Sequence, residues 1–273
     1  MINPHPPSLL SDRDAEPHAR AVPAVIAAWL IGLATLVFIR FRVSWTPYVA
    51  FHKWLHDLGV PDGARRLDYT LLMLLPVAIG ALLLRWRAGV APARAVLLQR
   101  PRAGWVGATG LAAAPAVLGG AVLMLARHHQ PLAPELIGGV VRAPILEELF
   151  LRGLLVGLPL VALDLRGRAF WSVAAVAAVV FGFMHIQWSA AGLASGWPNL
   201  LVTAGGGIWF AWLMRSWRSI VVPMFMHAAM NLCWILAGVS DAGGGGLAEN
   251  GLRFASIAIA TVATLRSLRC PRP

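Results

Sequence analysis

Long apolar runs recur along almost the whole chain, and short clusters of basic residues separate them. Runs of roughly 17 to 25 apolar residues are long enough to cross a bilayer as an α-helix, which bonds its own backbone polar groups within lipid. With 58% hydrophobic and only 13% charged residues, the composition excludes an ordinary soluble domain. We therefore predict an all-α fold: one domain of a polytopic helical membrane protein with about eight transmembrane helices, embedded in the lipid bilayer.

The predicted spans follow the apolar runs. Pro144 and Pro159 interrupt the fourth run, which we expect to be bent, re-entrant or split. The uncharged stretch 187–198, between the fifth and sixth runs, is expected to be a loop. The spans are expected at about residues 21–39, 67–84, 104–126, 135–163, 169–186, 199–214, 219–237 and 252–265.

Polarity divides the chain into four segments. A polar N-terminal arm (1–20) precedes a group of N-terminal transmembrane helices (21–130). A core that contains the polar motifs (131–238) is followed by a Gly-rich linker, a last helix and a basic tail (239–273). No small-residue cleavage site follows the first apolar run, so we expect it to remain as a span.

The net charge of +11 comes from basic residues that lie mainly between the apolar runs. This distribution is typical of loops that flank a membrane, and it does not predict a nucleic-acid partner. If the N-terminus is cytoplasmic, most of these residues fall in cytoplasmic segments, which favours cytoplasmic termini at both ends. The basic loop after the first span argues in the opposite direction.

Two adjacent carboxylates and a guanidinium interrupt the fourth run at Glu147, Glu148 and Arg152. Ionisable groups at membrane depth are costly without partners and mark functional sites. On a helix, Glu148 and Arg152 are four residues apart and share a face, so we expect them to pair. Glu147 is rotated by about 100° from Glu148 and is therefore expected to face a cavity.

Two later runs carry further polar groups at helical spacing. Phe181 and His185 are four residues apart in the fifth run, and His227 and Asn231 are four apart in the seventh. Counting about 1.5 Å per residue from the helix ends places these groups and Glu147 at overlapping depths in the bilayer. We expect them to converge on one site.

These groups together suit hydrolysis of a peptide bond. Glu147 and His185 can hold a water molecule and take its proton as it attacks a carbonyl. His227 and Asn231 can donate hydrogen bonds to the oxyanion that develops. Each polar residue taken alone also fits an ordinary contact between helices, but that reading must explain four such residues on three helices.

Other intramembrane hydrolase designs fit the sequence less well. It contains no HExxH motif and no GxGD-type aspartate pair. A zinc site formed by Glu147, His185 and His227 stays open as an alternative, because two histidines and one carboxylate are suitable ligands. We expect a water molecule activated without a metal or other cofactor.

The order EExxxR, FxxxH, HxxxN on successive apolar runs resembles the CPBP family of intramembrane endopeptidases, which includes CAAX prenyl proteases and bacterial Abi proteins. The resemblance covers about residues 142–236. It implies a glutamate-type mechanism in which Glu147 and His185 activate water and His227 and Asn231 form the oxyanion site. In that mechanism Glu148, Arg152 and Phe181 support the site.

The resemblance also implies a kind of substrate: a membrane-associated or C-terminally anchored protein or peptide, cut near its C-terminus or within a membrane-embedded segment. The high Ala, Arg and Gly content indicates a GC-rich bacterial genome, and hence a protein of the bacterial cytoplasmic (inner) membrane. A non-catalytic scaffold or immunity protein of the same fold, or a small transporter, remains an alternative.

Overall fold

The computed structural model describes residues 15–41, 46–59, 67–239 and 246–269. Within these ranges the regular structure is entirely helical, which confirms the predicted all-α fold. The elements are α1 (Ala15–Phe41), α2 (Thr46–Asp57), α4 (Leu67–Ala88), α5 (Pro92–Ala95), α6 (Trp105–Ala126), α7 (Ala133–Leu136), η3 (Ile137–Arg142), α8 (Ala143–Glu147), η4 (Glu148–Gly157), α9 (Leu158–Ala162), α10 (Gly167–Met184), α11 (Ala190–Trp217), α12 (Val221–Leu236) and α13 (Leu247–Arg269).

Five of the described helices are long and apolar enough to cross a membrane: the Arg20–Phe41 part of α1, then α4, α6, α10 and α13. They coincide with five of the predicted spans, and the polytopic helical architecture is confirmed. The other three predicted spans correspond to the shorter apolar helix α12, to α11, and to the continuous succession from α7 to α9.

The predicted fourth span is one helical rod in which α-helical and π-helical turns alternate. Two N–H groups, those of Ala143 and Leu158, donate to carbonyls five residues earlier, at Gly138 and Gly153. Each of these π turns ends immediately before a proline. Because proline lacks an N–H and its ring crowds the carbonyl four residues earlier, a wider turn lets the helix continue.

The expected loop at 187–198 is wrong, because α11 begins at Ala190. The Ser189 side chain accepts a hydrogen bond from the Gly192 N–H and caps the helix. Pro198 lies inside the helix. Prolines are tolerated in membrane helices where neighbouring groups satisfy the freed carbonyl.

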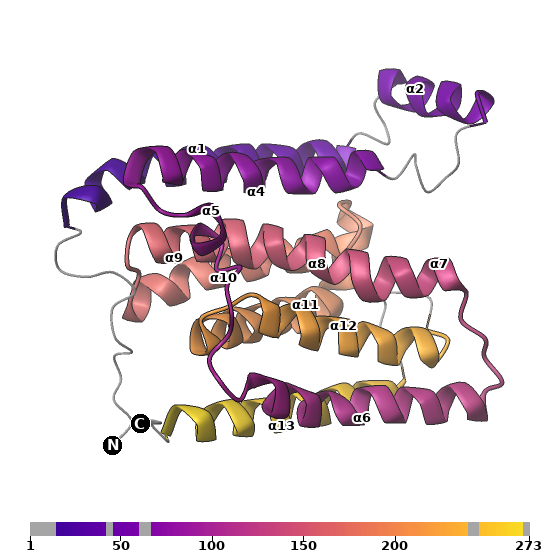
Figure 1. The fold of residues 1–273 in the computed structure, drawn as a ribbon. Helices are drawn as coiled ribbons and strands as arrows, with labels where there is room; N and C mark the ends of the chain where they lie inside the picture. The colour runs from indigo at the N-terminus through magenta and orange to yellow at the C-terminus, as the bar shows by residue number, and fades with distance from the viewer. Residues whose placement is uncertain (1–14, 42–45, 60–66, 240–245, 270–273) are drawn as a thin grey trace.

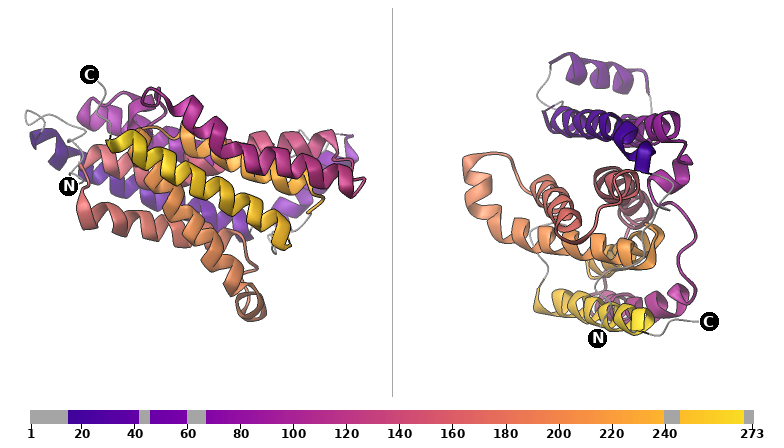
Figure 2. Two further views of the ribbon diagram at one scale, coloured as in Figure 1. Left: turned by 90° about the horizontal axis from the view of Figure 1, so that it is seen from below. Right: turned by 90° about the vertical axis from the view of Figure 1, so that its left-hand side faces the viewer.

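The helices stack in layers (Figure 1). The pair α1 and α4 covers one side, the pair α6 and α13 covers the other, and the rod, α10, α11 and α12 lie between them. The two further views show α11 running obliquely across the bundle (Figure 2). The start of α1 and the end of α13 lie at the same end of the bundle, as expected if both termini share one side of the membrane.

The rod forms the centre of the core. Every residue from 150 to 162 is buried, including Phe150, Leu151, Leu154 and Leu155. A helix that is apolar on all sides is stable only when other elements surround it. The charged residues at the start of η4 are therefore placed within the protein interior.

Candidate active site

Glu148 and Arg152 form the predicted ion pair, with Arg152 Nη1 3.1 Å from Glu148 Oε1. Both side chains are buried, at 0% and 2% exposure. Both residues belong to the first turn of η4. The apolar residues that follow in η4 are buried and hold this turn in the core. A buried carboxylate and a buried guanidinium need such a partner, because an unpaired charge in the interior costs several kcal/mol.

His227 of α12 lies between the two adjacent glutamates. Its Nδ1 is 2.9 Å from Glu148 Oε1, and its Nε2 is 3.8 Å from Glu147 Oε2. A carboxylate only accepts hydrogen bonds, so Nδ1 carries the proton and donates it to Glu148. Glu147 thus faces the second nitrogen of the same ring, at a distance longer than a hydrogen bond.

Aromatic rings enclose this charged group. The Arg152 guanidinium lies 4.4 Å above the Phe181 ring and 5.1 Å from the Phe210 ring. Phe210 also stacks on His227, with ring centroids 5.3 Å apart and planes 23° apart. These rings exclude solvent on one side and fix the orientations of Arg152 and His227.

Three buried polar atoms of the site have no hydrogen-bond partner within the described part of the chain: Glu147 Oε2, Glu148 Oε2 and Arg152 Nη2. The two carboxylates and one guanidinium leave a net charge of −1 when His227 is neutral. An imidazolium at His227 would balance the four groups. Buried net charge is costly unless polar groups meet it, so the unbonded atoms of this cluster mark where a water molecule or a substrate would be bound.

His185 caps the C-terminus of α10. Its Nδ1 lies 2.8 Å from the Phe181 carbonyl oxygen, which can only accept, so Nδ1 bears the proton and the Nε2 lone pair is available in the neutral ring. The amide of Asn199 donates to the His185 carbonyl at 3.2 Å. His185 is therefore held from two sides as a potential base.

Phe181 separates the two histidines. Its ring centroid lies 4.6 Å from that of His185 and 6.0 Å from that of His227. Among the described residues, no hydrogen bond or ion pair joins His185 directly to Glu147. The structure brings Glu147, Glu148, Arg152 and His227 together. His185 lies on the other side of the Phe181 ring from His227.

Asn231 lies one helical turn beyond His227 on α12. Its side-chain amide donates to the Gly139 carbonyl of η3 at 2.9 Å. A Cβ atom at Gly139 would lie 2.5 Å from Ile235 Cδ1, so the end of that flexible side chain packs directly over the glycine. Asn231 therefore ties α12 to the rod, and one of its two amide hydrogens is used in that contact.

Three residues of this site escape the sequence reasoning. Phe210 stacks on His227, the Asn199 amide donates to the His185 carbonyl, and the Gly139 carbonyl accepts from Asn231. Asn199 could have been found from the sequence, since it is a polar residue at the edge of an apolar run. Phe210 and Gly139 could not, because an aromatic residue or a glycine inside an apolar run does not stand out from its neighbours.

The described residues contain no group of three or more His, Cys, Asp or Glu side chains placed to hold a metal ion. Both nitrogens of His227 are directed at glutamates, and Nδ1 of His185 is directed at a carbonyl. The use of water without a metal stays a prediction, and zinc stays its alternative.

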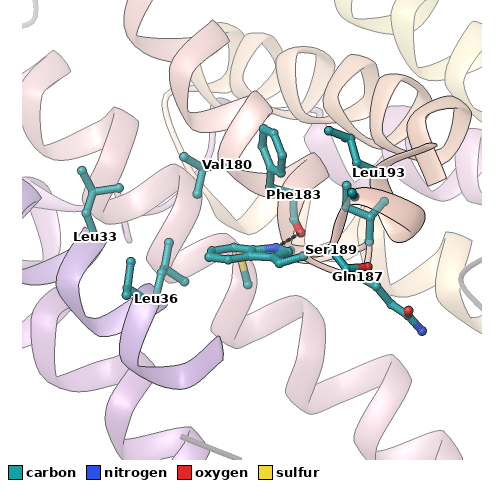
Figure 3. A pocket seen from close by; sticks show the side chains of 12 residues that line it. Leu33, Leu36, Val180, Phe183, Gln187, Ser189 and Leu193 are labelled. Carbon is teal, nitrogen blue, oxygen red and sulfur yellow. Dashed lines mark hydrogen bonds between the residues drawn. The ribbon is translucent and has the colours of Figure 1, made fainter. Parts of the chain in front are cut away.

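An apolar groove of about 720 Å³ adjoins His185, between α1 and the turn from α10 to α11 (Figure 3). The Trp188 indole N–H donates to the Phe183 carbonyl at 2.6 Å and fixes one wall. The Arg40 guanidinium lies 5.7 Å from the Trp188 ring at this wall. The lining residues are Leu33, Leu36, Val37, Val180, Phe183, Met184, Ile186, Gln187, Trp188, Ser189, Ala190 and Leu193.

Comparison with known proteins gives one family. Residues 129–233 match the family model described as type II CAAX prenyl endopeptidase Rce1-like. The matched segment contains the glutamates, Arg152, both histidines and Asn231, but not the α1 residues that line the groove. Searches of curated proteins and of solved structures find no match. Residues 129–233 are thus similar to the Rce1-like CAAX proteases, whose members are intramembrane endopeptidases, and this match supports the resemblance to the CPBP family.

Proposed function

We propose that this protein is a glutamate-type intramembrane endopeptidase that hydrolyses a peptide bond with water activated by Glu147 and His185. One observation carries the proposal: the buried His227 ring faces a different glutamate with each of its nitrogens. Glu148 Oε1 is bonded to both Arg152 and His227, whereas Glu147 is left without a hydrogen bond from the described residues. One carboxylate thus serves the structure and the other is available for chemistry.

In the proposed reaction, a water molecule held near Glu147 attacks the scissile carbonyl carbon. Its proton passes to Glu147 or to the free Nε2 of His185. The resulting tetrahedral intermediate collapses, the C–N bond breaks, and the same proton is delivered to the leaving amine. The products are a new carboxylate and a new amine.

His227 and Asn231 would stabilise the oxyanion of that intermediate. With Nδ1 bound to Glu148, an imidazolium at His227 would present its Nε2–H beside Glu147, toward the reacting carbonyl. Asn231 uses one amide hydrogen for the Gly139 carbonyl and retains a second. Fixed donors in a buried site stabilise a developing negative charge far more than they would in water.

The proposed substrate is a membrane-associated protein or peptide, anchored by a lipid or apolar segment near its C-terminus. The name of the matched family specifies prenyl substrates, which carry an apolar chain. The groove beside His185 is apolar along α1 and α10 and has the volume of a ligand site. An apolar anchor in this groove would bring the adjoining peptide to His185.

A cleavage assay with membrane proteins tests the proposal. Purified wild type and His185→Ala are reconstituted in liposomes with membrane proteins of the source cell, with and without EDTA, and new C-termini are identified by mass spectrometry. We expect new C-termini with wild type in EDTA and none with His185→Ala. The exposed His56 provides the control, since His56→Ala should cleave like wild type.

Each other result would change the proposal in a defined way. Loss of cleavage in EDTA that zinc restores would assign the same residues to a metal site. Unchanged cleavage by folded His185→Ala would refute the role of this base. Absence of wild-type products would favour the scaffold alternative.

A further inference from the structure

A second charged cluster lies where α6 ends, α12 ends and α13 begins, at the end of the bundle opposite the start of α1 (Figure 1). Arg127 Nη1 is 2.5 Å from Glu249 Oε1 and donates to the Ala237 carbonyl at 2.7 Å. Glu249 is buried, with only 1% of its surface exposed. This ion pair joins the three helix ends, and it gives the carboxylate of the cluster its counter-charge.

Arg253, one helical turn after Glu249 on α13, is half-buried, and no ion pair joins it to a carboxylate in the described part of the chain. Its guanidinium stacks on the Trp234 ring of α12, 4.0 Å from the ring centroid. The Nε of Arg253 and the indole Nε1 of Trp234 are both buried, and neither has a hydrogen-bond acceptor among the described residues. One stacked pair of side chains thus holds two unpaired N–H donors, and each is costly to leave so.

The cluster carries an excess of positive charge. Arg127 and Arg253 contribute two positive charges and Glu249 contributes one negative charge, which leaves a net charge of +1. A cation that is partly removed from water needs a counter-charge or strong acceptors. An anion with acceptor oxygens beside Arg253 and Trp234 would satisfy the donors and also remove the excess charge.

Arg253 and Trp234 lie where the bundle meets the boundary between membrane and water. Arg253 follows directly after the start of the span predicted at 252–265. Trp234 precedes the last residue of α12 by two residues, which is about 3 Å along the helix axis. Tryptophan and arginine are typical of this depth, where the lipid headgroups lie. The phosphates of these headgroups are therefore within reach of the unpaired donors.

The surface of α13 that continues from Arg253 suits the acyl chains of a lipid. Phe254, Val262 and Leu265 are exposed by 60%, 48% and 37%. Steps of eight and three residues place these side chains along one face of the helix, where they form an apolar stripe. A lipid with its phosphate at Arg253 would lay its chains along this stripe, whereas a free anion would gain nothing from it.

We propose that Arg253 and Trp234 form a binding site for the phosphate of an anionic phospholipid. A phosphate offers several acceptor oxygens, which suits a guanidinium and a neighbouring indole N–H. Basic pockets between membrane helices bind headgroups in this way. An anionic lipid also balances the excess charge of the cluster, whereas the ammonium group of a zwitterionic lipid would cancel the charge of its own phosphate. The site does not depend on the proposed protease function.

The test measures lipid binding to the full-length protein in a neutral detergent by native mass spectrometry. The lipids are phosphatidylglycerol and phosphatidylcholine with the same acyl chains. We expect wild type to bind its first phosphatidylglycerol on the order of 10-fold more tightly than phosphatidylcholine. Arg253→Met should abolish this preference. Trp234→Phe keeps an aromatic ring but removes the N–H donor, so it should reduce the preference.

Arg266 provides the matched control, because it is an exposed arginine on the same helix near its opposite end. Arg266→Met should keep the preference for phosphatidylglycerol. Equal binding of the two lipids by wild type, or an unchanged preference in folded Arg253→Met, would overturn the site. If Arg253→Met does not fold, Trp234→Phe decides, and an unchanged preference in that variant would overturn the site.

Thermal unfolding distinguishes a lipid from a free anion as the ligand. Phosphatidylglycerol should raise the melting temperature of wild type more than that of Arg253→Met, and the same concentration of inorganic phosphate should leave wild type unchanged. An equal rise with inorganic phosphate would assign the site to a free anion and overturn the lipid. An equal rise with phosphatidylglycerol in wild type and Arg253→Met would show that Arg253 serves packing alone.

Discussion

His227 donates its Nδ1 proton to Glu148 at 2.9 Å and turns its Nε2 toward Glu147 at 3.8 Å. Two glutamates that are adjacent in sequence therefore meet the two ends of one ring. Glu148 is bonded on the protein side by Arg152 as well, whereas Glu147 has no such bond from the described residues. This asymmetry separates a structural carboxylate from a reactive one, and it makes the two residues distinguishable by experiment.

Replacing Glu148 with glutamine should destabilise the fold much more than replacing Glu147. Glu148→Gln removes the counter-charge of the buried Arg152 and weakens the His227 contact, and breaking a buried pair costs about 3–5 kcal/mol. Glu147→Gln removes no hydrogen bond and should leave the melting temperature nearly unchanged. Thermal unfolding of both variants in detergent measures the difference, and equal melting temperatures would contradict the assigned roles.

Arg152→Lys should also destabilise the protein, although it conserves the charge. A lysine cannot lie flat against both Phe181 and Phe210, and a desolvated cation–π contact contributes up to about 2 kcal/mol. Arg166→Lys is the control, since Arg166 pairs with Asp164 at the surface. The melting temperature should fall for Arg152→Lys alone.

Sequence spacing predicted the contacts that lie within one helix. Glu148 meets Arg152, and Phe181 meets His185, because residues four apart share a helix face. The Glu148–Arg152 pair forms although the helix is π-helical there, since the wider turn still keeps these residues close.

Residue spacing within one helix could not predict the contacts between different helices. Glu148 and His227 are 79 residues apart, and nothing in either apolar run specifies which glutamate approaches which nitrogen. We expected Glu147 and His185 to hold one water molecule, and that arrangement stays a prediction. The stacking of Phe210 on His227 depends on how α11 crosses the bundle, which periodicity does not encode.

The start of α11 shows how composition misleads in a membrane protein. The uncharged stretch 187–198 was expected to be a loop, yet the helix begins at Ala190 behind the Ser189 cap. An added Cβ at Gly196 would lie 2.9 Å from the Ile186 side chain, so that glycine permits close packing of the turn against the helix. Small residues at helix contacts are common in membranes, and a Gly-rich stretch there need not break a helix.

Gly120→Ala should disrupt the contact between α6 and α12. An added Cβ at Gly120 would lie 2.9 Å from the Cys233 Cα, a backbone atom that cannot move aside without shifting α12, which carries His227 and Asn231. We expect a loss of about 1–3 kcal/mol in stability. Gly110→Ala on the same helix has open space within 4 Å and should be neutral, so unfolding of the two variants side by side checks the account.

Asn231→Ala should lower kcat by about 10²–10³ if its second amide hydrogen reaches the oxyanion. Ile235→Ala loosens the same contact between α12 and Gly139 but removes no hydrogen-bond donor. Its kcat therefore shows how much of the loss in Asn231→Ala comes from packing alone. A similar fall in kcat for both variants would mean that Asn231 acts only as a tether.

The most direct test of the central claim is the cleavage rate of Glu147→Gln in liposomes, measured beside wild type on a substrate identified by mass spectrometry. Glutamine has the shape of glutamate but accepts no proton from water. The account predicts a folded protein with the wild-type melting temperature and a rate lowered by a factor of about 10² or more. A folded Glu147→Gln that cleaves at the wild-type rate would contradict the account.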